Sequence, residues 1–211
     1  MPSYKLISFD GKALAEVVRY LMELKGIKYE DRRIQKEAWP DLKPKTPLGQ
    51  LPVLEIDGIQ YPHSHAMYRY LAREYDFYGS SSKEQLEIDV VCETVDDIWP
   101  EFYKIFNAEG DEKKNELRKK LADDGAMKLI TNLEKLLKKN NNGSGWFIGK
   151  KVTLADVMAF NIIYDFLPAV LEIKEGEFDL KEHDVLKAFV DRFKAQDKIA
   201  DWIKRRPKTP F

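Results

Sequence analysis

The sequence predicts a two-part fold: an α/β N-terminal domain with the element order β-α-β-β-β-α, followed by an all-α C-terminal domain. Three observations predict it. Short β-prone stretches and amphipathic helices alternate over the first 78 residues, a polar Gly-Ser-Ser-Ser stretch begins at Gly79, and apolar residues then recur at helical spacing. We therefore expect an α/β domain at 1–78, a linker at 79–83 and a helical domain at 84–211.

The first unit of the α/β domain is a strand, a helix and a second strand. Residues 4–9 alternate and are β-prone, which predicts a strand. Apolar residues from 13 to 24 recur every three or four positions, and Gly26 stands where a helix commonly ends. Residues 27–34 predict a second strand, which a right-handed crossover would place parallel to the first.

The remainder of this domain predicts a hairpin and a helix. Residues 37–50 contain three prolines and are expected to be irregular. A strand over 53–56, the turn dipeptide Asp57-Gly58 and a return strand over 59–61 predict an antiparallel hairpin. A helix should begin at Ser64 and run to about residue 75.

The second domain reads as helices throughout. We expect one long helix over 84–107, bent at Pro100, and a second over 112–140. A capping-box pattern at 153–156 opens an apolar helix that Pro168 should end or kink. Short helices are expected near 185–195 and 199–204.

Composition excludes several classes of protein. Hydrophobic residues make up 44% of the 211, and 35 basic residues face 36 acidic ones, so a globular protein is expected and a nucleic-acid partner is not. The single cysteine excludes an intrachain disulfide. No stretch reaches the length of a membrane span, so we expect no membrane partner and a cytoplasmic location.

Several blocks in a fixed order resemble one family over essentially the whole chain. They include the segments at 2–6, 28–34, 39–44, 49–58, 69–74, 153–156 and 202–207. With them the sequence resembles the sigma-class cytosolic glutathione transferases, the group that includes haematopoietic prostaglandin D synthase and the S-crystallins. The resemblance implies a thioredoxin-like first domain that binds glutathione as co-substrate, a helical domain that shapes the electrophile pocket, and a homodimer.

The resemblance also implies the glutathione-binding residues. A cis bond is expected at Leu51-Pro52, where the Leu51 backbone would pair with the extended tripeptide. Cationic and helix N-terminal groups suit its two carboxylates. The positions that match the family are Trp39, Lys43, Gln50, Leu51, Pro52, His63, Ser64 and, on the acidic helix, Asp97.

The catalytic position departs from the family pattern. Sigma enzymes lower the pKa of the glutathione thiol with a tyrosine hydroxyl, and Ser8 stands at that tyrosine's position. Serine keeps a donor but is a weaker acid, and its oxygen lies several ångström short of the tyrosine's. Ser8 acting directly, Ser8 acting through a water, or Tyr103 acting in its place all remain open.

Two further groups of residues complete the expected site. Four aromatic residues are expected to hold the electrophile: Phe9, Trp99, Phe102 and Tyr103. The acidic residues Glu93, Asp96 and Asp97 share one helix face, which in the family lies at the dimer interface. The choice between Asp96 and Asp97 as the glutathione contact is open. A divalent cation held by Glu93, Asp96 and Asp97 is a further alternative, and no other metal is expected.

Three functions are compatible with the sequence. The first is a transferase that conjugates or reduces small hydrophobic electrophiles with glutathione thiolate, with activity weakened by Ser8. The second is a non-catalytic glutathione-binding or structural protein of the S-crystallin type, which Ser8 favours. The third is prostaglandin D2 synthesis, a narrower activity that also depends on an activated thiol.

Overall fold

The computed structural model describes residues 2–209. The chain forms two compact units. The first comprises the residues up to Phe77 together with those from Ala195 onward, and the second spans Tyr78–Lys194. The last helix therefore groups with the α/β unit, whereas the sequence analysis places it in the helical domain.

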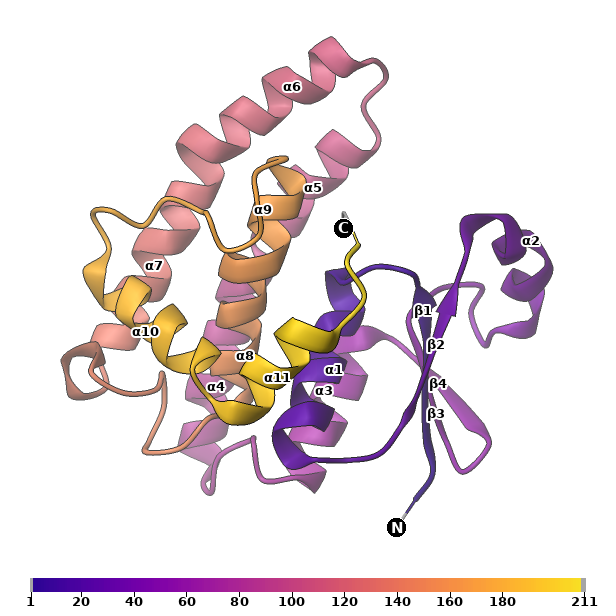
Figure 1. Ribbon diagram of the computed structural model, residues 1–211. Coiled ribbons are helices and arrows are strands. Elements are labelled where there is room, and N and C mark those ends of the chain that lie inside the picture. Colours follow the sequence, from indigo (N-terminus) through magenta and orange to yellow (C-terminus); the bar gives the residue numbers. More distant parts are fainter. Residues whose placement is uncertain (1, 210–211) are drawn as a thin grey trace. The chain divides into compact units, whose positions relative to one another are not determined.

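A mixed four-stranded sheet forms the centre of the first unit (Figure 1). The strand order is β2-β1-β3-β4, with β1 parallel to β2 and the other neighbours antiparallel. The parallel pair and the hairpin confirm the predicted order of strands. The strands are β1 (Tyr4–Phe9), β2 (Glu30–Ile34), β3 (Val53–Ile56) and β4 (Ile59–Pro62).

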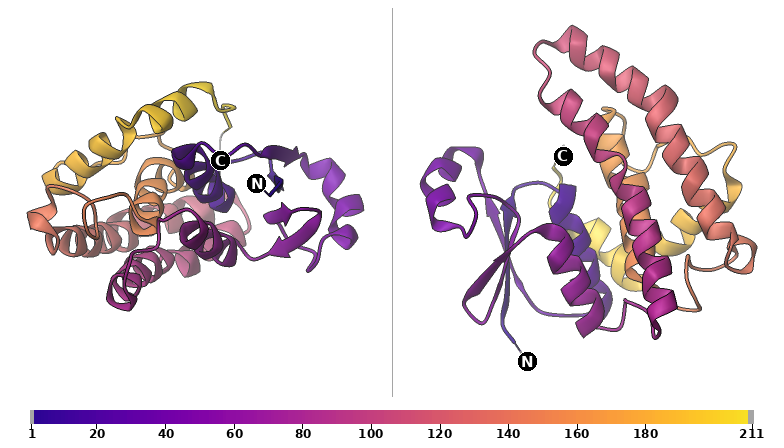
Figure 2. Two further views of the ribbon diagram at one scale, coloured as in Figure 1. Left: turned by 90° about the horizontal axis from the view of Figure 1, so that it is seen from below. Right: turned by 180° about the vertical axis from the view of Figure 1, so that it is seen from behind.

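Helices cover both sides of this sheet. Helices α1 (Ala13–Lys25) and α3 (Ser64–Glu74) pack on one face, and α11 (Asp197–Arg205) packs against α1. The short helix α2 (Trp39–Leu42) lies on the opposite side of the strands (Figure 2). It sits between two 3-10 turns, Lys36–Ala38 and Lys43–Lys45, in the segment expected to be irregular.

Local turn chemistry explains the boundaries in this unit. Asp57 and Gly58 both have positive φ, 51° and 84°, as the tight turn between two antiparallel strands requires. Gly26 ends α1 with φ 72°, and its N–H is bonded to carbonyls of the last turn. The second strand begins at Glu30 rather than at residue 27, so the predicted strand was too long at its start.

The second unit is all-helical, as predicted. Its core is formed by the apolar faces of α4, α7, α8 and α10. The α-helices are α4 (Ser82–Asp96), α5 (Trp99–Phe106), α6 (Asp111–Lys120), α7 (Met127–Lys138), α8 (Leu154–Asn161), α9 (Leu167–Val170) and α10 (Asp184–Lys194). The shorter turns are the π segments η3 (Leu121–Ala126) and η5 (Ile162–Phe166), and the 3-10 turn η4 (Asn141–Gly143).

Two predicted helices differ from those observed. The single helix expected over 84–107 is wrong, because the chain breaks at Asp97 and Ile98 and restarts at Trp99. Pro100 stands in the first turn of α5, where its missing N–H and fixed φ cost nothing. Pro168 likewise fails to end the preceding helix, since helical backbone continues to Val170.

The capping box is confirmed. Both oxygens of Asp156 accept hydrogen bonds of 2.8 Å: one from the N–H of Phe147, the other from the N–H and hydroxyl of Thr153. Asp156 is fully buried, and this burial raises the pKa of its carboxyl to about 6 despite the hydrogen bonds. The box therefore fixes the start of α8 within the core of the second unit.

Candidate active site

The register of the sheet brings the end of β1 beside the cis-proline turn. Ile7 on β1 is paired with Val53 on β3 in an antiparallel ladder. In this antiparallel register the next residue of β1, Ser8, lies opposite Pro52, which immediately precedes β3 at the end of the sheet. The Leu51-Pro52 bond is cis, as the family resemblance implies, and it directly precedes β3.

The start of α3 lies at this same end. Val53 pairs with Pro62, so His63 and Ser64 leave the sheet next to the proline turn. Ser64 is the first residue of α3, and the first turn of a helix presents backbone N–H groups without helical acceptors. His63 adopts a positive φ of 71°, unusual for a residue with a side chain, and this conformation turns the chain into the helix. A helix N-terminus of this kind has the chemistry that suits an anion, as the sequence analysis expects at Ser64.

The segment around α2 contains Trp39 and Lys43, the aromatic and cationic residues predicted to bind glutathione. The ring of Trp39 meets that of Phe9 edge to face, with 5.4 Å between the centroids. Lys43 is exposed, and its stem lies against Gly49, where an added Cβ would be 3.5 Å from the lysine Cε. Gln50, the next residue, is exposed as well. Seven of the eight predicted glutathione residues thus belong to the first unit, and Asp97 belongs to the second.

Ser8 is buried and bonded within the first unit. Its side chain belongs to a residue only 3% exposed. The hydroxyl accepts a hydrogen bond of 2.8 Å from Arg19 Nη2, and its own proton is directed at the carbonyl of Phe9, 3.0 Å away. The hydroxyl can therefore donate to a thiolate only by leaving the Phe9 carbonyl.

Arg19 belongs to a buried ionic network that centres on Glu16 of α1. Glu16 accepts hydrogen bonds from Arg19 at 2.9 Å, from Arg206 at 2.5 Å and from the indole of Trp202 at 2.7 Å. Burial opposes ionisation of Glu16, but Arg206 and Arg19 outweigh it and keep its pKa below the ordinary value. Arg19 also donates to Asp31 on β2 at 3.1 Å. The network thus joins α1, β2 and the C-terminal segment.

Three of the four predicted pocket aromatics form one cluster in the second unit. The ring centroid of Trp99 lies 5.6 Å from that of Phe102 and 6.2 Å from that of Tyr103. Phe166, on the π segment η5, packs 4.7 Å from Trp99 and was not singled out from the sequence. Tyr103 is exposed, so its hydroxyl lies at the surface of the second unit.

The acidic residues of α4 have different surroundings. Asp96 accepts a hydrogen bond of 2.9 Å from the indole N–H of Trp99 and so positions the aromatic cluster. Glu93 and Asp97 are exposed. The carboxylate of Asp97 makes no hydrogen bond or ion pair with any residue in the described range 2–209. Asp97 is therefore the better of the two candidates for a ligand contact.

Sequence reasoning missed the residues that hold Ser8. Arg19 and Glu16 lie within the buried stretch of α1, where their neighbours are apolar. A charged residue inside an apolar run is the signal that could have found them, because a buried charge needs a partner. Their partners Trp202 and Arg206 are more than 180 residues away along the chain, so no local pattern names them.

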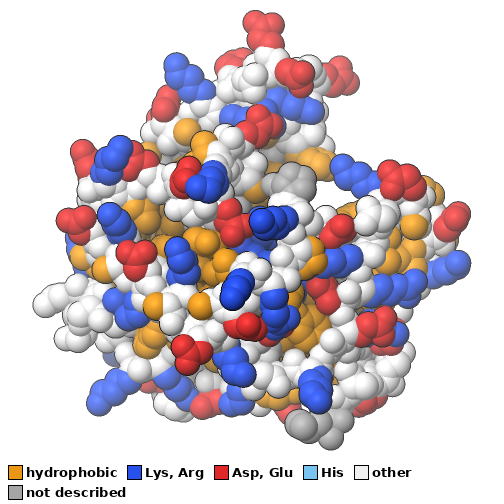
Figure 3. Space-filling model, in the orientation of Figure 1, with side chains coloured by type: hydrophobic (Ala, Val, Ile, Leu, Met, Phe, Trp, Pro, Cys, Tyr) orange, Lys and Arg blue, Asp and Glu red, His pale blue; other side chains and the backbone are white. Residues whose placement is uncertain are grey.

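Neither a metal cluster nor a membrane-spanning helix is found in the described part of the chain. Within residues 2–209, no three His, Cys, Asp or Glu side chains are arranged to hold a metal ion, so the weak expectation of a cation at the acidic residues gains no support. No helix in that range is long and apolar enough to cross a membrane. Figure 3 shows cationic and anionic side chains interspersed over the visible face, as the balanced composition predicts.

Comparison with known proteins defines the family. Residues 6–81 match the family model for the glutathione S-transferase N-terminal domain, and residues 96–206 match that for the C-terminal domain. S-crystallin SL11 of Nototodarus sloanii is 37% identical, and glutathione S-transferase 1 of Ascaris suum is 35% identical, each over 100% of both chains. The structure of rat hPGDS in complex with a quinoline matches with a TM-score of 0.87 and 32% identity over 100% of both chains.

These matches identify the glutathione transferase fold, in which a thioredoxin-like domain precedes a helical domain. The chain belongs to the glutathione S-transferase family.

Proposed function

We propose that this chain is a sigma-class glutathione transferase that conjugates or reduces small hydrophobic electrophiles. In this proposal residues 1–78 bind glutathione, 79–83 are a linker, and 84–211 shape the electrophile pocket. The observation that carries it is the sheet register, which supports a common site for Ser8, the Leu51-Pro52 turn and Ser64 at one end of the first unit. A thiol co-substrate suits a reducing compartment such as the cytoplasm.

Glutathione would lie extended along the cis-proline turn, with its two carboxylates held at opposite ends. Lys43 and the Trp39 indole would bind the glycyl carboxylate, and Ser64 with the α3 N-terminus would bind the γ-glutamyl carboxylate. The Leu51 backbone would pair with the cysteinyl residue as an added strand does. Three further predicted contacts would come from Gln50, Pro52 and His63.

In the reaction the glutathione thiol loses its proton to water, and the thiolate attacks the electrophile. With an alkyl or aryl electrophile a carbon–sulfur bond forms, and the leaving group departs with the bonding electrons. Ser8 stands at the thiol position, where a hydroxyl that donates to the thiolate lowers the thiol pKa. Because its proton is directed at the Phe9 carbonyl, we expect weaker activation than a tyrosine gives.

The aromatic residues Phe9, Trp99, Phe102 and Tyr103 would supply the apolar surface for the electrophile. We further propose a homodimer in which Asp97 of the partner subunit binds the glutathione amine. The open carboxylate of Asp97 and the use of Asp96 by Trp99 support this choice. Prostaglandin D2 synthesis is a narrower candidate that rests on the likeness to hPGDS.

Calorimetric titration with glutathione tests the proposal. We expect the native chain to bind, and Lys43→Ala to weaken binding about tenfold through loss of a charge-assisted hydrogen bond. Lys45→Ala, in the same exposed 3-10 turn, is the matched control and should bind as the native chain does. Absence of glutathione binding by the native chain would refute the proposed function.

Conjugation of glutathione to a nitro-activated aryl chloride then separates the competing functions. A rate above the uncatalysed background supports the transferase. Binding without any acceleration would instead identify a non-catalytic glutathione-binding protein of the S-crystallin type, the alternative that the bonded Ser8 hydroxyl favours.

A further inference from the structure

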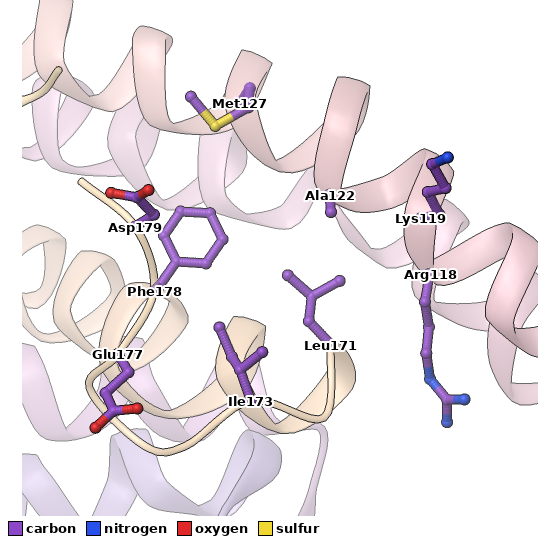
Figure 4. A pocket seen from close by; sticks show the side chains of 9 residues that line it. All are labelled: Arg118, Lys119, Ala122, Met127, Leu171, Ile173, Glu177, Phe178 and Asp179. Carbon is purple, nitrogen blue, oxygen red and sulfur yellow. The ribbon is translucent and has the colours of Figure 1, made fainter. Parts of the chain in front are cut away.

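Two features of the structure lie outside the predicted site residues, and the first is a cavity in the second unit (Figure 4). Its volume is about 440 Å³, and apolar side chains such as Leu171 and Ile173 line it. In Figure 4 the side chain of Lys119 extends away from the cavity, and Arg118 is bonded to the Val170 carbonyl at 3.1 Å. The cavity therefore does not identify a ligand, whereas the second feature, at the start of α1, bears on the candidate active site.

The second feature is the loop between β1 and α1, which directly follows Ser8 and Phe9. Ala13, the first residue of α1, has a φ of 37°, in the left-handed region that residues with a side chain rarely adopt. Lys12 occupies the N-cap position, where its side chain has no acceptor for the free N–H groups of the first helical turn. Neither residue favours this conformation locally, so contacts from outside the loop must hold it.

One of these contacts comes from the C-terminal segment. Lys12 is buried, and its Nζ donates to the backbone carbonyl of Thr209 at 3.4 Å, 197 residues further along the chain. The chain leaves α11 at Arg206 and runs past the N-terminal end of α1, as Figure 1 shows. A buried ammonium group needs polar partners, and the Thr209 carbonyl supplies one.

A second path joins the same segment to the same loop. Arg206 is buried, and it donates to Glu16 at 2.5 Å and to the hydroxyl of Tyr20 at 2.8 Å. Glu16 also accepts from Arg19 at 2.9 Å, and Arg19 donates to the Gly11 carbonyl at 2.7 Å. The loop is therefore held at two points, and both lead to the residues that follow α11. All of these residues belong to the first unit.

We propose that the C-terminal segment 206–209 positions the β1–α1 loop, with Lys12 as the positioning residue. The loop carries no predicted glutathione contact, but it follows Phe9, whose ring packs on Trp39 and is expected to contact the electrophile. Release of Lys12 therefore displaces Phe9 and weakens the electrophile site, while the glutathione residues on other segments stay in place. The catalytic part of this inference rests on the proposed function, and the positioning itself does not.

Amide hydrogen exchange tests the positioning without any assay of activity. Lys12→Met removes the ammonium donor and keeps an apolar stem, and a chain that ends at Pro207 lacks Thr209. In both variants we expect peptides that cover residues 9–13 to exchange about threefold to tenfold faster, the effect of losing one hydrogen bond. Lys12→Arg keeps a cationic donor and should exchange as the native chain does. Lys198→Met, an exposed change on α11, is the matched control and should not differ from the native chain.

Conjugation kinetics then test the consequence for the reaction. With a nitro-activated aryl chloride as the electrophile, Lys12→Met should raise the KM of the electrophile about threefold to tenfold. The KM of glutathione should change less than about twofold, because the predicted glutathione residues lie outside the loop. Lys12→Arg should restore the native KM of the electrophile. A general loss of structure would instead raise both KM values together.

Three results would overturn the positioning. They are unchanged exchange over residues 9–13 in both Lys12→Met and the shortened chain, an equal rise in Lys198→Met, or failure of Lys12→Arg to restore native exchange. Faster exchange with an unchanged KM for the electrophile would overturn the catalytic consequence. If the native chain binds no glutathione, the proposed function fails, and the exchange result still decides the positioning. If circular dichroism shows that Lys12→Met does not fold, the shortened chain decides the exchange experiment.

Discussion

The guanidinium of Arg19 donates a 2.8 Å hydrogen bond to the hydroxyl of Ser8, and both side chains are buried in the first unit. Ser8 in turn donates to the Phe9 carbonyl. At the position where the family resemblance implies a thiol-activating tyrosine, this chain thus has a short side chain that accepts a hydrogen bond from a buried cation. Substitutions of Ser8 can therefore distinguish a structural role, as the acceptor for Arg19, from a catalytic role, as a donor to the thiolate.

Ser8→Ala separates a structural from a catalytic role. We expect the free energy of unfolding to fall by about 1–3 kcal/mol, because a buried N–H of Arg19 loses its acceptor. We expect kcat/KM for conjugation to change less than about threefold, because the hydroxyl proton is directed at the Phe9 carbonyl. Urea unfolding and a conjugation assay measure the two quantities. Ser82→Ala, an exposed serine on α4, should change neither.

The opposite outcome would assign catalysis to Ser8. A loss of about 10² in kcat/KM, with stability intact, is the size expected when a preorganised donor is removed. It would mean that the hydroxyl leaves the Phe9 carbonyl once glutathione is bound.

Ser8→Tyr should raise transferase activity. A phenol is a stronger acid than an aliphatic hydroxyl and reaches further from the strand, so it can donate to the thiolate. We expect a gain on the order of 10² in kcat/KM and a lower pKa of the bound glutathione thiol, followed by its ultraviolet absorbance. Ser8→Phe adds the ring without the hydroxyl and is the matched control. Equal gains in both variants would show that the ring alone is responsible.

Glu16→Gln should destabilise the first unit severely. The neutral amide leaves Arg19 and Arg206 buried without their shared counter-charge, and breaking a buried pair of this kind costs about 3–5 kcal/mol. Because the folded-state pKa of Glu16 is lowered, its contribution is present above the unfolded pKa and is lost as pH falls through the folded value. Urea unfolding at pH 7 measures the loss. Glu37→Gln, an exposed change, should cost less than about 0.5 kcal/mol.

Local signals predicted much of the fold because a few neighbouring residues determine those features. The Asp57-Gly58 turn and the capping box at Asp156 are examples. The π segments η3 and η5 left no such signal, since one extra residue per turn does not alter helical propensity and depends on tertiary packing. The break after α4 was likewise invisible, because Pro100 is compatible with both a kink and a helix start.

The candidate site shows the same limit. Residues such as Lys43 and Ser64 could be predicted because they lie in contiguous blocks that match the family. The surroundings of Ser8 could not be predicted. Arg19 reaches Ser8 from α1 across the helix–sheet interface, and Glu16 accepts a hydrogen bond from the distant Trp202. A sequence pattern identifies residue types at a position, whereas these bonds depend on where distant side chains meet.

Asp156→Asn should destabilise the second unit in a pH-dependent way. The amide offers one acceptor in place of two, so a buried donor at Phe147 or Thr153 loses its partner at a cost of about 1–3 kcal/mol. In the native chain the pKa of Asp156 is about 6, against an ordinary 3.8, so the folded state binds more protons between these values. Its contribution to stability therefore falls by about 2 kcal/mol as pH rises from 4 to 7.

The difference in unfolding free energy between the native chain and Asp156→Asn isolates this group from the other carboxyls. That difference should shrink as pH rises through this range, in urea titrations at closely spaced pH values. A difference that stays constant with pH would show that the three hydrogen bonds offset burial and hold the pKa near its ordinary value.

The exposed face of α4 should mediate the proposed homodimer. Leu86 and Val90 are 64% and 43% exposed, and they share this face with Glu93 and Asp97. Exposed apolar residues beside a defined polar group are typical of a contact between subunits. We expect the native chain to sediment as a dimer and Val90→Glu to shift it toward monomer, since the new carboxylate would be desolvated next to Glu93.

Ile173→Glu is the matched control for this experiment, because Ile173 is 41% exposed on a segment distant in sequence from α4. It should leave the sedimentation of the chain unchanged. If Val90→Glu remains dimeric, the subunits meet elsewhere, and a partner's Asp97 could not be assigned to the glutathione amine on this ground. Loss of glutathione affinity together with dissociation, in Val90→Glu but not in Ile173→Glu, would link the dimer to the completeness of the site.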